Sequence, residues 1–187
     1  MDIDGVMNYT DDYINKRGVE IFQKEVLDGS KYSIQERFNV TEEEVRQFWH
    51  QIYADYLIHC EKTKGLKEFT RQLYEYGHKI VVITSRLQFD HGMNEEDVKE
   101  LTRQFVYSAV YDYEKIIHTK DKGEIAKKLG IDLMIEDNEY FIEQVKEVCP
   151  VWCPMLPYNK DYLGNNTDSR VKVYRNFDEI LEEMRKR

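Results

Sequence analysis

The chain has 187 residues, 41% of them hydrophobic, which is enough for one globular domain with a core or for a domain with a small insertion. Its formal net charge of −9 argues against a nucleic-acid polymer or an anionic membrane as a partner, because both carry negative charge. There is no apolar run of about 18 residues and no signal peptide, so we expect a soluble, cytoplasmic protein without a membrane partner. Three cysteines lack the spacing of a zinc site or a disulfide and are expected to be buried, reduced thiols: Cys60, Cys149 and Cys153.

The chain opens with two carboxylates one residue apart, Asp2 and Asp4, followed at once by Gly5. In extended backbone alternate side chains share a face, so both carboxylates would point the same way, and glycine permits a sharp turn after them. Converging carboxylates can hold Mg²⁺, and one can attack phosphorus while the other moves a proton; an ordinary solvated turn is the alternative. A strand carrying such a pair normally has several apolar residues before it. Only Met1 precedes Asp2, and we expect that the chain as given begins late.

Residues 9–63 contain no convincing strand and are predicted to be helical, with helices over 12–26 and 41–60. The second helix opens with a capping box of Thr41 and Glu44, and Val40 with Val45 can form a hydrophobic staple across it. We therefore expect a helical cap at residues 9–63, inserted into an α/β core made of residues 1–8 and 64–187.

The rest of the chain alternates strands and helices. Strands are predicted at 79–84, 113–118, 132–136, 151–155 and 171–174. Helices are predicted at 66–76, with Leu66, Phe69, Leu73 and Tyr76 on one face, at 123–129, at 141–148 and from Asn176, where Glu179 completes a capping box, to the basic terminus. This alternation predicts a Rossmann-like parallel sheet with helices on both faces.

Parallel α/β sheets bind ligands at the carboxyl ends of their strands, and further polar groups are expected there. Thr84 and Ser85 can offer hydroxyl and backbone N–H groups to a phosphate, although a plain helix cap is an alternative. For Arg86 two roles are equally favoured, a contact with the substrate and an ion pair on the surface. An ammonium before the next strand could balance carboxylate and phosphoryl charge; Lys122 is preferred to Lys120 because it begins a predicted helix.

The strand at 132–136 ends in Glu136 and Asp137, which add carboxylate oxygens for a hard cation or, alternatively, form a surface turn. Four segments together resemble the four motifs of the haloacid dehalogenase superfamily of phosphohydrolases, in order and rough spacing. They are Asp2-Ile3-Asp4-Gly5, Ile80 to Thr84, Lys122, and Leu133 to Asp137. Ile83 to Arg86, Ile135 to Asp137 and Leu156-Pro157-Tyr158-Asn159 look like the superfamily's 5'(3')-deoxyribonucleotidase branch and that branch's bacterial relatives.

The resemblance implies that Asp2 is the nucleophile that forms an aspartyl-phosphate, and that Asp4 protonates the leaving oxygen and then activates water. It implies Mg²⁺ on Asp2, the Asp4 carbonyl and Asp137, with Glu136 in or near its coordination shell. It also implies that phosphate is bound by three side chains, Thr84, Ser85 and Lys122, the last of which positions the nucleophile.

Five aromatic residues of the predicted cap fall at helical spacing, and a cap core is favoured over a base-stacking wall for them: Phe22, Phe48, Trp49, Tyr53 and Tyr56. His59 and His118 are expected to be structural. The function favoured is Mg²⁺-dependent hydrolysis of a small phosphomonoester, with a nucleoside monophosphate as the favoured substrate. Three alternatives remain: a phosphatase of another small metabolite, a non-catalytic phosphate- or metal-binding module, and a phosphotransferase.

Overall fold

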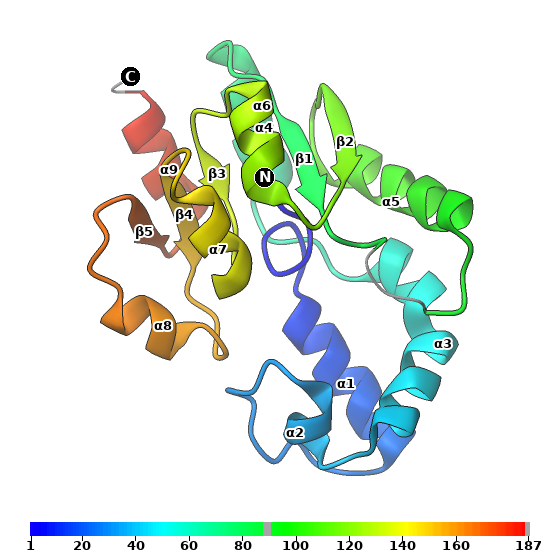
Figure 1. The fold of residues 1–187 in the computed structure, drawn as a ribbon. Helices are drawn as coiled ribbons and strands as arrows, with labels where there is room; N and C mark the ends of the chain where they lie inside the picture. The colour runs from blue at the N-terminus through cyan, green and yellow to red at the C-terminus, as the bar shows by residue number, and fades with distance from the viewer. Residues whose placement is uncertain (88–90, 186–187) are drawn as a thin grey trace.

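A computed structural model describes residues 1–87 and 91–185 of the chain (Figure 1). Its helices are α1 (Thr10–Phe22), α2 (Ile34–Phe38), α3 (Glu42–His59), α4 (Leu66–Glu75), α5 (Glu95–Ala109), α6 (Lys122–Leu129), α7 (Glu139–Val145), α8 (Lys160–Asn165) and α9 (Phe177–Met184). Its strands are β1 (Val81–Thr84), β2 (Lys115–His118), β3 (Met134–Ile135), β4 (Val151–Pro154) and β5 (Val171–Tyr174). The predicted strands and the predicted helices α4, α6, α7 and α9 follow one another in the expected order, with two further helices, α5 and α8, among them.

All strand pairs are parallel: β1 with β2, β3 with β4, and β4 with β5. The start of the chain lies between β1 and β3 and joins these two groups. The Ile83 amide donates to the Met1 carbonyl at 3.0 Å, and the Asp2 amide donates to the Ile135 carbonyl at 2.9 Å. A two-residue extended segment therefore stands at the centre of the sheet, where a longer strand was expected.

Extended backbone ends at Asp2, and the expectation that Asp2 and Asp4 share one face of a strand is wrong. The amides of Val6 and Met7 both donate to the Ile3 carbonyl, at 3.2 and 2.7 Å, so Asp4 lies in a tight turn. The turn continues through Gly5, whose φ of +76° is favourable only for glycine.

Helices cover both faces of the sheet, as predicted. On one face α4, α5 and α9 pack on alternate strand residues, among them Val82, Ile135 and Trp152. On the other face α6, α7 and α8 pack on Ile83, Met134, Val151 and Cys153. Because strand side chains alternate between the faces, the two helical layers bury most of β1, β3 and β4, whereas the edge strands β2 and β5 are partly exposed. All three cysteines are free and buried, which confirms that expectation.

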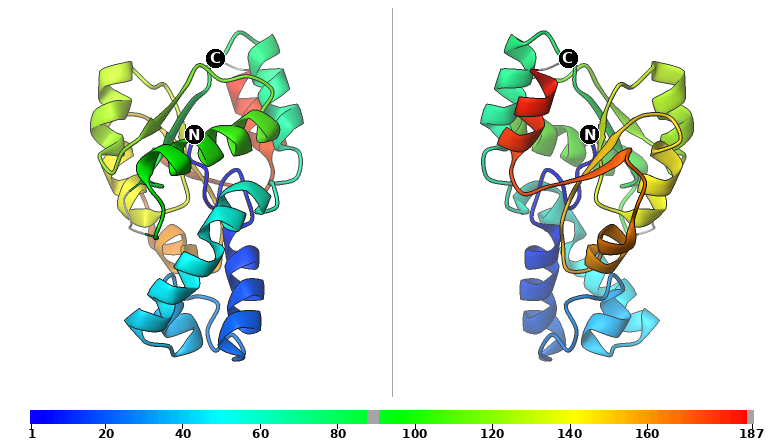
Figure 2. Two further views of the ribbon diagram at one scale, coloured as in Figure 1. Left: turned by 90° about the vertical axis from the view of Figure 1, so that its right-hand side faces the viewer. Right: turned by 90° about the vertical axis from the view of Figure 1, so that its left-hand side faces the viewer.

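Helices α1, α2 and α3 form a lobe beyond the carboxyl ends of the strands (Figures 1 and 2). They have a small core of their own, in which the rings of Phe22, Phe38 and Phe48 pack together. The capping box of α3 is present: Thr41 Oγ1 accepts from the Glu44 amide at 3.2 Å, and Glu44 accepts from the Thr41 amide at 2.7 Å. The lobe also touches the sheet domain, since α3 packs along α5.

Several expectations differ from the structure in detail. α1 ends at Phe22 rather than Val26, because Gln23 takes a left-handed conformation with φ 52°. Helices α2, α5 and α8 were not predicted. At α9 the Asn176 side chain accepts from the amides of Asp178 and Glu179, but the Glu179 carboxylate accepts from Arg175 and not from Asn176, so the capping box is incomplete. The predicted end of this helix, at residues 186–187, lies outside the described residues.

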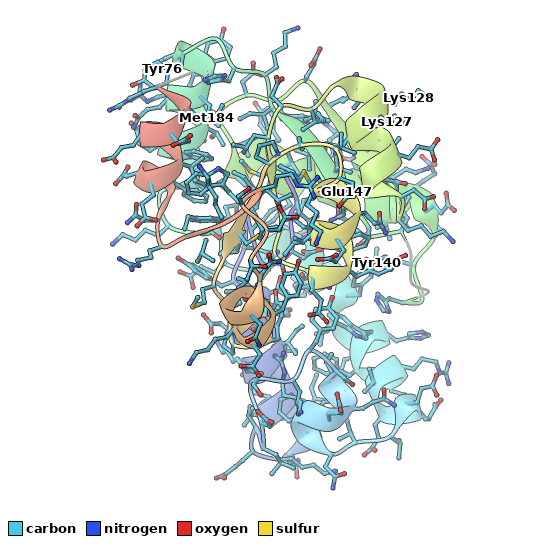
Figure 3. The ribbon with its side chains drawn as sticks, turned by 60° about the vertical axis from the view of Figure 1, so that its left-hand side comes forward. Tyr76, Lys127, Lys128, Tyr140, Glu147 and Met184 are labelled. Atoms are coloured by element: carbon cyan, nitrogen blue, oxygen red, sulfur yellow. The ribbon has the colours of Figure 1, made fainter. Side chains whose placement is uncertain are left out.

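Helices α4 and α9 contact each other at the end of the molecule opposite the lobe, where Figure 3 labels Tyr76 and Met184. Tyr76 was placed on the apolar face of its helix, but its ring is 46% exposed and its hydroxyl accepts from Arg185 at 2.8 Å. Within residues 1–87 and 91–185, no helix is both long and apolar enough to cross a membrane.

Candidate active site

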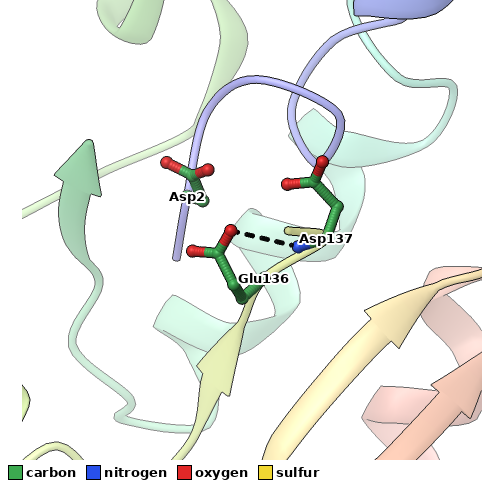
Figure 4. A group of neighbouring side chains, drawn as sticks. All are labelled: Asp2, Glu136 and Asp137. Carbon is green, nitrogen blue, oxygen red and sulfur yellow. Dashed lines mark hydrogen bonds between the residues drawn. The ribbon is translucent and has the colours of Figure 1, made fainter. Parts of the chain in front are cut away.

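Three buried carboxylates meet at the carboxyl ends of the central strands. Asp2 comes from the start of the chain, and Glu136 and Asp137 follow β3 (Figure 4). One oxygen from each lies within 4.8 Å of the others. The exposed fractions are 5%, 0% and 4%, so water cannot screen the charges of this group.

Lys122, the first residue of α6, lies among these carboxylates. Its Nζ is 2.7 Å from Glu136 Oε2 and 2.9 Å from Asp2 Oδ1, and 4.2 Å from the centre of the Phe141 ring. Burial alone would lower the pKa of Lys122, but Asp2 and Glu136 outweigh it and hold the pKa above its ordinary value. The rival Lys120 is exposed, as are Lys127 and Lys128 farther along α6 (Figure 3).

The carboxylates of the cluster differ in how many hydrogen bonds they accept. Glu136 uses both oxygens, because Oε2 accepts from Lys122 and Oε1 accepts from the amides of Asp137 and Asn138, at 3.3 and 3.2 Å. Asp137 Oδ1, in contrast, is buried and accepts no hydrogen bond from residues 1–87 or 91–185. Burial, the negative charge of Glu136 and that of Asp2 raise the pKa of Asp137 well above its ordinary value. Burial and Glu136 likewise raise the pKa of Asp2 to about 7.

This arrangement fits a hard divalent cation. An orphaned, buried carboxylate oxygen beside a second carboxylate of raised pKa indicates a lack of positive charge, which Lys122 alone does not supply. Carboxylate oxygens are the ligands that such cations prefer. Gly5 adds to the fit, since a Cβ there would lie 2.4 Å from Asp137 Oδ2, so only glycine lets the turn approach the cluster so closely.

Side chains after β4 fix Asp137 in place. The Tyr158 hydroxyl donates to Asp137 Oδ2, and Asn159 Nδ2 donates to the Asp137 carbonyl at 2.8 Å and to the Pro154 carbonyl at 3.0 Å. From the lobe, Tyr32 packs edge-on against Tyr158, with ring centres 5.2 Å apart. These supports were missed as site residues because Tyr32 lies in a loop without periodicity, and Tyr158 and Asn159 were noted only for family resemblance.

The Asp4 carboxylate does not join the three-carboxylate cluster. It forms an ion pair with Arg86, whose Nη2 is 2.6 Å from Asp4 Oδ1, and it also accepts from Tyr56 and Asn8. Burial would raise the pKa of Asp4, but the Arg86 guanidinium and these hydrogen bonds outweigh it and lower the pKa. Arg86 thus forms an ion pair, as one of the two interpretations held, but its side chain is buried rather than on the surface, and its partner is a candidate catalytic residue.

The two candidate phosphate-binding hydroxyls follow one another at the end of β1. Thr84 is buried, its Oγ1 lies 3.4 Å from the Arg86 amide, and its backbone pairs with His118 of β2. Ser85 is half-buried at the same edge of the sheet. His118 is also half-buried, whereas His59 is exposed on α3.

The aromatic stripe of the lobe is a packed core. Phe48, Tyr53 and Tyr56 are at most 4% exposed, and Trp49 stacks on His91 with ring centres 4.9 Å apart. These rings therefore do not form an open wall beside the site. Tyr32, in contrast, is 65% exposed and reaches the site through Tyr158.

Comparison with known proteins identifies the fold. No family model matches the chain, and no curated protein matches it either. Among solved structures, a predicted phosphatase from Clostridium acetobutylicum matches with TM-score 0.66 and 18% identity, over 100% of this chain and 96% of that one. A D,D-heptose 1,7-bisphosphate phosphatase from B. bronchiseptica, complexed with magnesium and phosphate, matches with TM-score 0.59 and 12% identity, over 99% of this chain and 96% of that one.

A predicted phosphoglycolate phosphatase from Haemophilus somnus 129pt gives a TM-score of 0.62 at 13% identity, over 98% of this chain and 95% of that one. At such low identities the likeness concerns the fold. The predicted α/β fold, with a parallel sheet between helices, is confirmed, and the chain shares it over nearly its whole length with structures of phosphatases.

Proposed function

We propose that this chain hydrolyses phosphomonoesters through an aspartyl-phosphate on Asp2. The observation that carries the proposal is the buried Asp2 carboxylate, paired with the buried Lys122 and lying beside Asp137 at the carboxyl ends of the strands. A structural ion pair would not require an additional orphaned carboxylate next to it. The fold shared with phosphatases supports the same chemistry.

In this proposal an Asp2 oxygen bonds to phosphorus as the bond to the leaving oxygen breaks, and Asp4 gives a proton to that oxygen. Because Arg86 and the hydrogen bonds to Asp4 lower its pKa, this step requires that the negative charge of the bound phosphoryl group first raises that pKa. Water then attacks phosphorus, Asp4 takes its proton, and Asp2 is released. Lys122 holds Asp2 in position and offsets negative charge, and Thr84 and Ser85 bind phosphoryl oxygens. Such a reaction depends mainly on positioning and on neutralised charge.

The proposed cation is Mg²⁺, held by Asp2, Asp137 and the backbone carbonyl of Asp4. Both Glu136 oxygens are already hydrogen-bonded, so we place Glu136 beside the cation, where it orients Lys122. When bound, Mg²⁺ would neutralise charge on the phosphoryl group and on the carboxylates.

Asp137→Asn tests the cation site. Because the change removes one anionic ligand at nearly constant volume, we expect the Mg²⁺ concentration for half-maximal rate to rise about tenfold or more. Activity should then recover partly at high Mg²⁺, as seen in a titration of phosphate release. A low rate that no concentration of Mg²⁺ changes would contradict the assignment of Asp137 as a ligand.

We further propose that residues 9–63 act as a cap over a core of residues 1–8 and 64–187. Asn8 and Lys62 form an antiparallel bridge, and the Tyr9 amide donates to the Glu61 carbonyl at 2.9 Å, so the two connections to the lobe run side by side. In a capped site the core contacts the phosphoryl group, and the cap contacts the remainder of the substrate.

For the substrate we propose a nucleoside monophosphate. Because the aromatic stripe of the lobe is buried, we propose that the exposed Tyr32 contacts the base. Stacking is worth about 1–3 kcal/mol per base, so Tyr32→Ala should raise KM for nucleotides about tenfold and leave methyl phosphate nearly unchanged. Tyr107→Ala is the matched control, because Tyr107 is 76% exposed on α5. Hydrolysis of sugar phosphates ten times better than every nucleotide would contradict this choice of substrate.

The proposed function is tested by phosphate release over a panel of nucleoside monophosphates, sugar phosphates and an aryl phosphate. We expect turnover with Mg²⁺ and none with EDTA. Binding of phosphate without turnover of any ester would instead indicate a binding module. Transfer of the phosphoryl group to an added alcohol in preference to water would indicate a phosphotransferase.

A further inference from the structure

The Asp4 carboxylate is held by side chains from separate parts of the chain. Arg86 Nη2 donates to its Oδ1 at 2.6 Å and Arg86 Nε to its Oδ2 at 3.0 Å. The Tyr56 hydroxyl donates to Oδ1 at 2.6 Å, and Asn8 Nδ2 donates to the same oxygen at 3.1 Å. The Asp4 side chain is nevertheless 29% exposed, so these contacts do not close it off from solvent.

Arg86 is itself fixed by its surroundings. Its side chain is 2% exposed, and its guanidinium lies 5.5 Å from the centre of the Tyr56 ring and 5.1 Å from that of Phe105. Its backbone carbonyl accepts from the Tyr53 hydroxyl at 2.7 Å. Because a guanidinium is planar and permanently charged, this fork sets the direction in which Asp4 points.

Tyr56 links Asp4 to the lobe. It lies on α3, and its hydroxyl is also 2.9 Å from Oγ1 of Thr10, the first residue of α1. Thr10 Oγ1 in turn accepts from the Gly5 amide at 3.0 Å. The turn that carries Asp4 is therefore joined by hydrogen bonds to both long helices of the lobe.

We infer that Tyr56 and Arg86 are positioning residues that aim the Asp4 carboxyl at the leaving oxygen. This inference rests on the proposed function. Asp4 must pass its proton to the leaving oxygen as the phosphorus–oxygen bond breaks and the bond from Asp2 to phosphorus forms. Proton transfer requires hydrogen-bond distance between the two groups, so a carboxyl that can swing freely loses rate.

The choice of leaving group separates this role from a merely structural one. An alkyl phosphate needs a proton on its leaving oxygen, whereas p-nitrophenolate leaves without one. For Tyr56→Phe we expect kcat/KM for an alkyl phosphate to fall about tenfold. This loss is a fraction of the rate enhancement of about a hundred- to ten-thousandfold that general acid–base catalysis contributes. For p-nitrophenyl phosphate we expect a fall of about twofold at most.

Tyr53→Phe is the matched control, since it removes one buried hydroxyl from the same helix, and that hydroxyl donates its hydrogen bond to the Arg86 backbone carbonyl rather than to Asp4. It should leave the ratio of the two kcat/KM values unchanged. Arg86→Lys, which keeps the charge but loses the fork, should move the ratio in the same direction as Tyr56→Phe. The ratio compares two esters on one protein, so a reduced folded fraction does not alter it.

Equal losses on both esters in Tyr56→Phe and Arg86→Lys would make these residues structural and would overturn the inference while the proposed function stands. A shift of the ratio in Tyr53→Phe as large as in Tyr56→Phe would overturn it as well. A wild-type protein inactive on both esters would overturn the proposed function, and the inference with it.

Discussion

Asp2→Asn is expected to lower kcat at least about a thousandfold, because it removes the proposed nucleophile with almost no change in volume. The fold should survive. Burial and Glu136 raise the pKa of Asp2 to about 7, above its usual value. The ionised Asp2 carboxylate therefore lowers the free energy of unfolding once the pH exceeds the ordinary pKa of a carboxyl group, and the full loss is reached above about pH 7. A neutral amide removes that cost, and we expect Tm to stay constant or to rise at pH 8.

The measurement is phosphate release, together with thermal unfolding of the same preparation. Asp132→Asn is the matched control, because Asp132 is exposed before β3 and should keep wild-type activity. An Asp2→Asn protein that is folded and keeps more than a tenth of wild-type activity would contradict the role of nucleophile.

Lys122→Met is expected to have the largest effect on stability. Lys122 is fully buried, and its removal leaves Asp2 and Glu136 without their shared cation. Losing one partner of a buried ion pair typically costs about 3–5 kcal/mol, and we expect a loss of that size in denaturant unfolding, together with loss of turnover. Lys120→Met, the exposed matched control, should change neither quantity by much.

A second variant separates charge from packing. Lys122→Met combined with Glu136→Gln removes one positive and one negative charge, so part of the lost stability should return while turnover stays absent. If Lys122→Met alone unfolds at the wild-type denaturant concentration, the carboxylates do not depend on Lys122 for compensation, and its assigned place in the site is wrong.

The local motifs and the parallel sheet could be predicted from sequence because each depends on short-range patterns. Lys122 and Asp137 lie at the start of a helix and the end of a strand, and such positions are visible in hydrophobic periodicity. The helix α5 was missed although its start is well marked: Asn94 accepts from the Asp97 amide, and acidic residues fill the first turn. That signal is local and could have been used.

The partners of Asp4 could not be predicted, because Arg86 and Tyr56 lie 82 and 52 residues away along the chain. Only the fold brings them together. The same limit applies to the lobe aromatics: helical spacing shows that they share a face, but not whether that face meets solvent or α5. Exposure of Tyr32 is likewise a property of the packed molecule.

At the chain start, a turn from Ile3 replaced the expected strand over Asp2 to Asp4. Hydrogen bonds to the Ile3 carbonyl and the close approach of Gly5 to Asp137 stabilise this turn. The alternation argument was therefore wrong about the backbone, and the two carboxylates have different partners: Asp2 pairs with Lys122 and Asp4 with Arg86.

The most direct test of the central claim is to locate the phosphoryl group on the enzyme. The protein would be quenched in acid during turnover of p-nitrophenyl phosphate with Mg²⁺, digested, and mapped by mass spectrometry. We predict one phosphoryl group, on Asp2, that is released by hydroxylamine and is absent from Asp2→Asn. Steady turnover with the phosphoryl group on any other residue would contradict the assignment of Asp2 as the nucleophile.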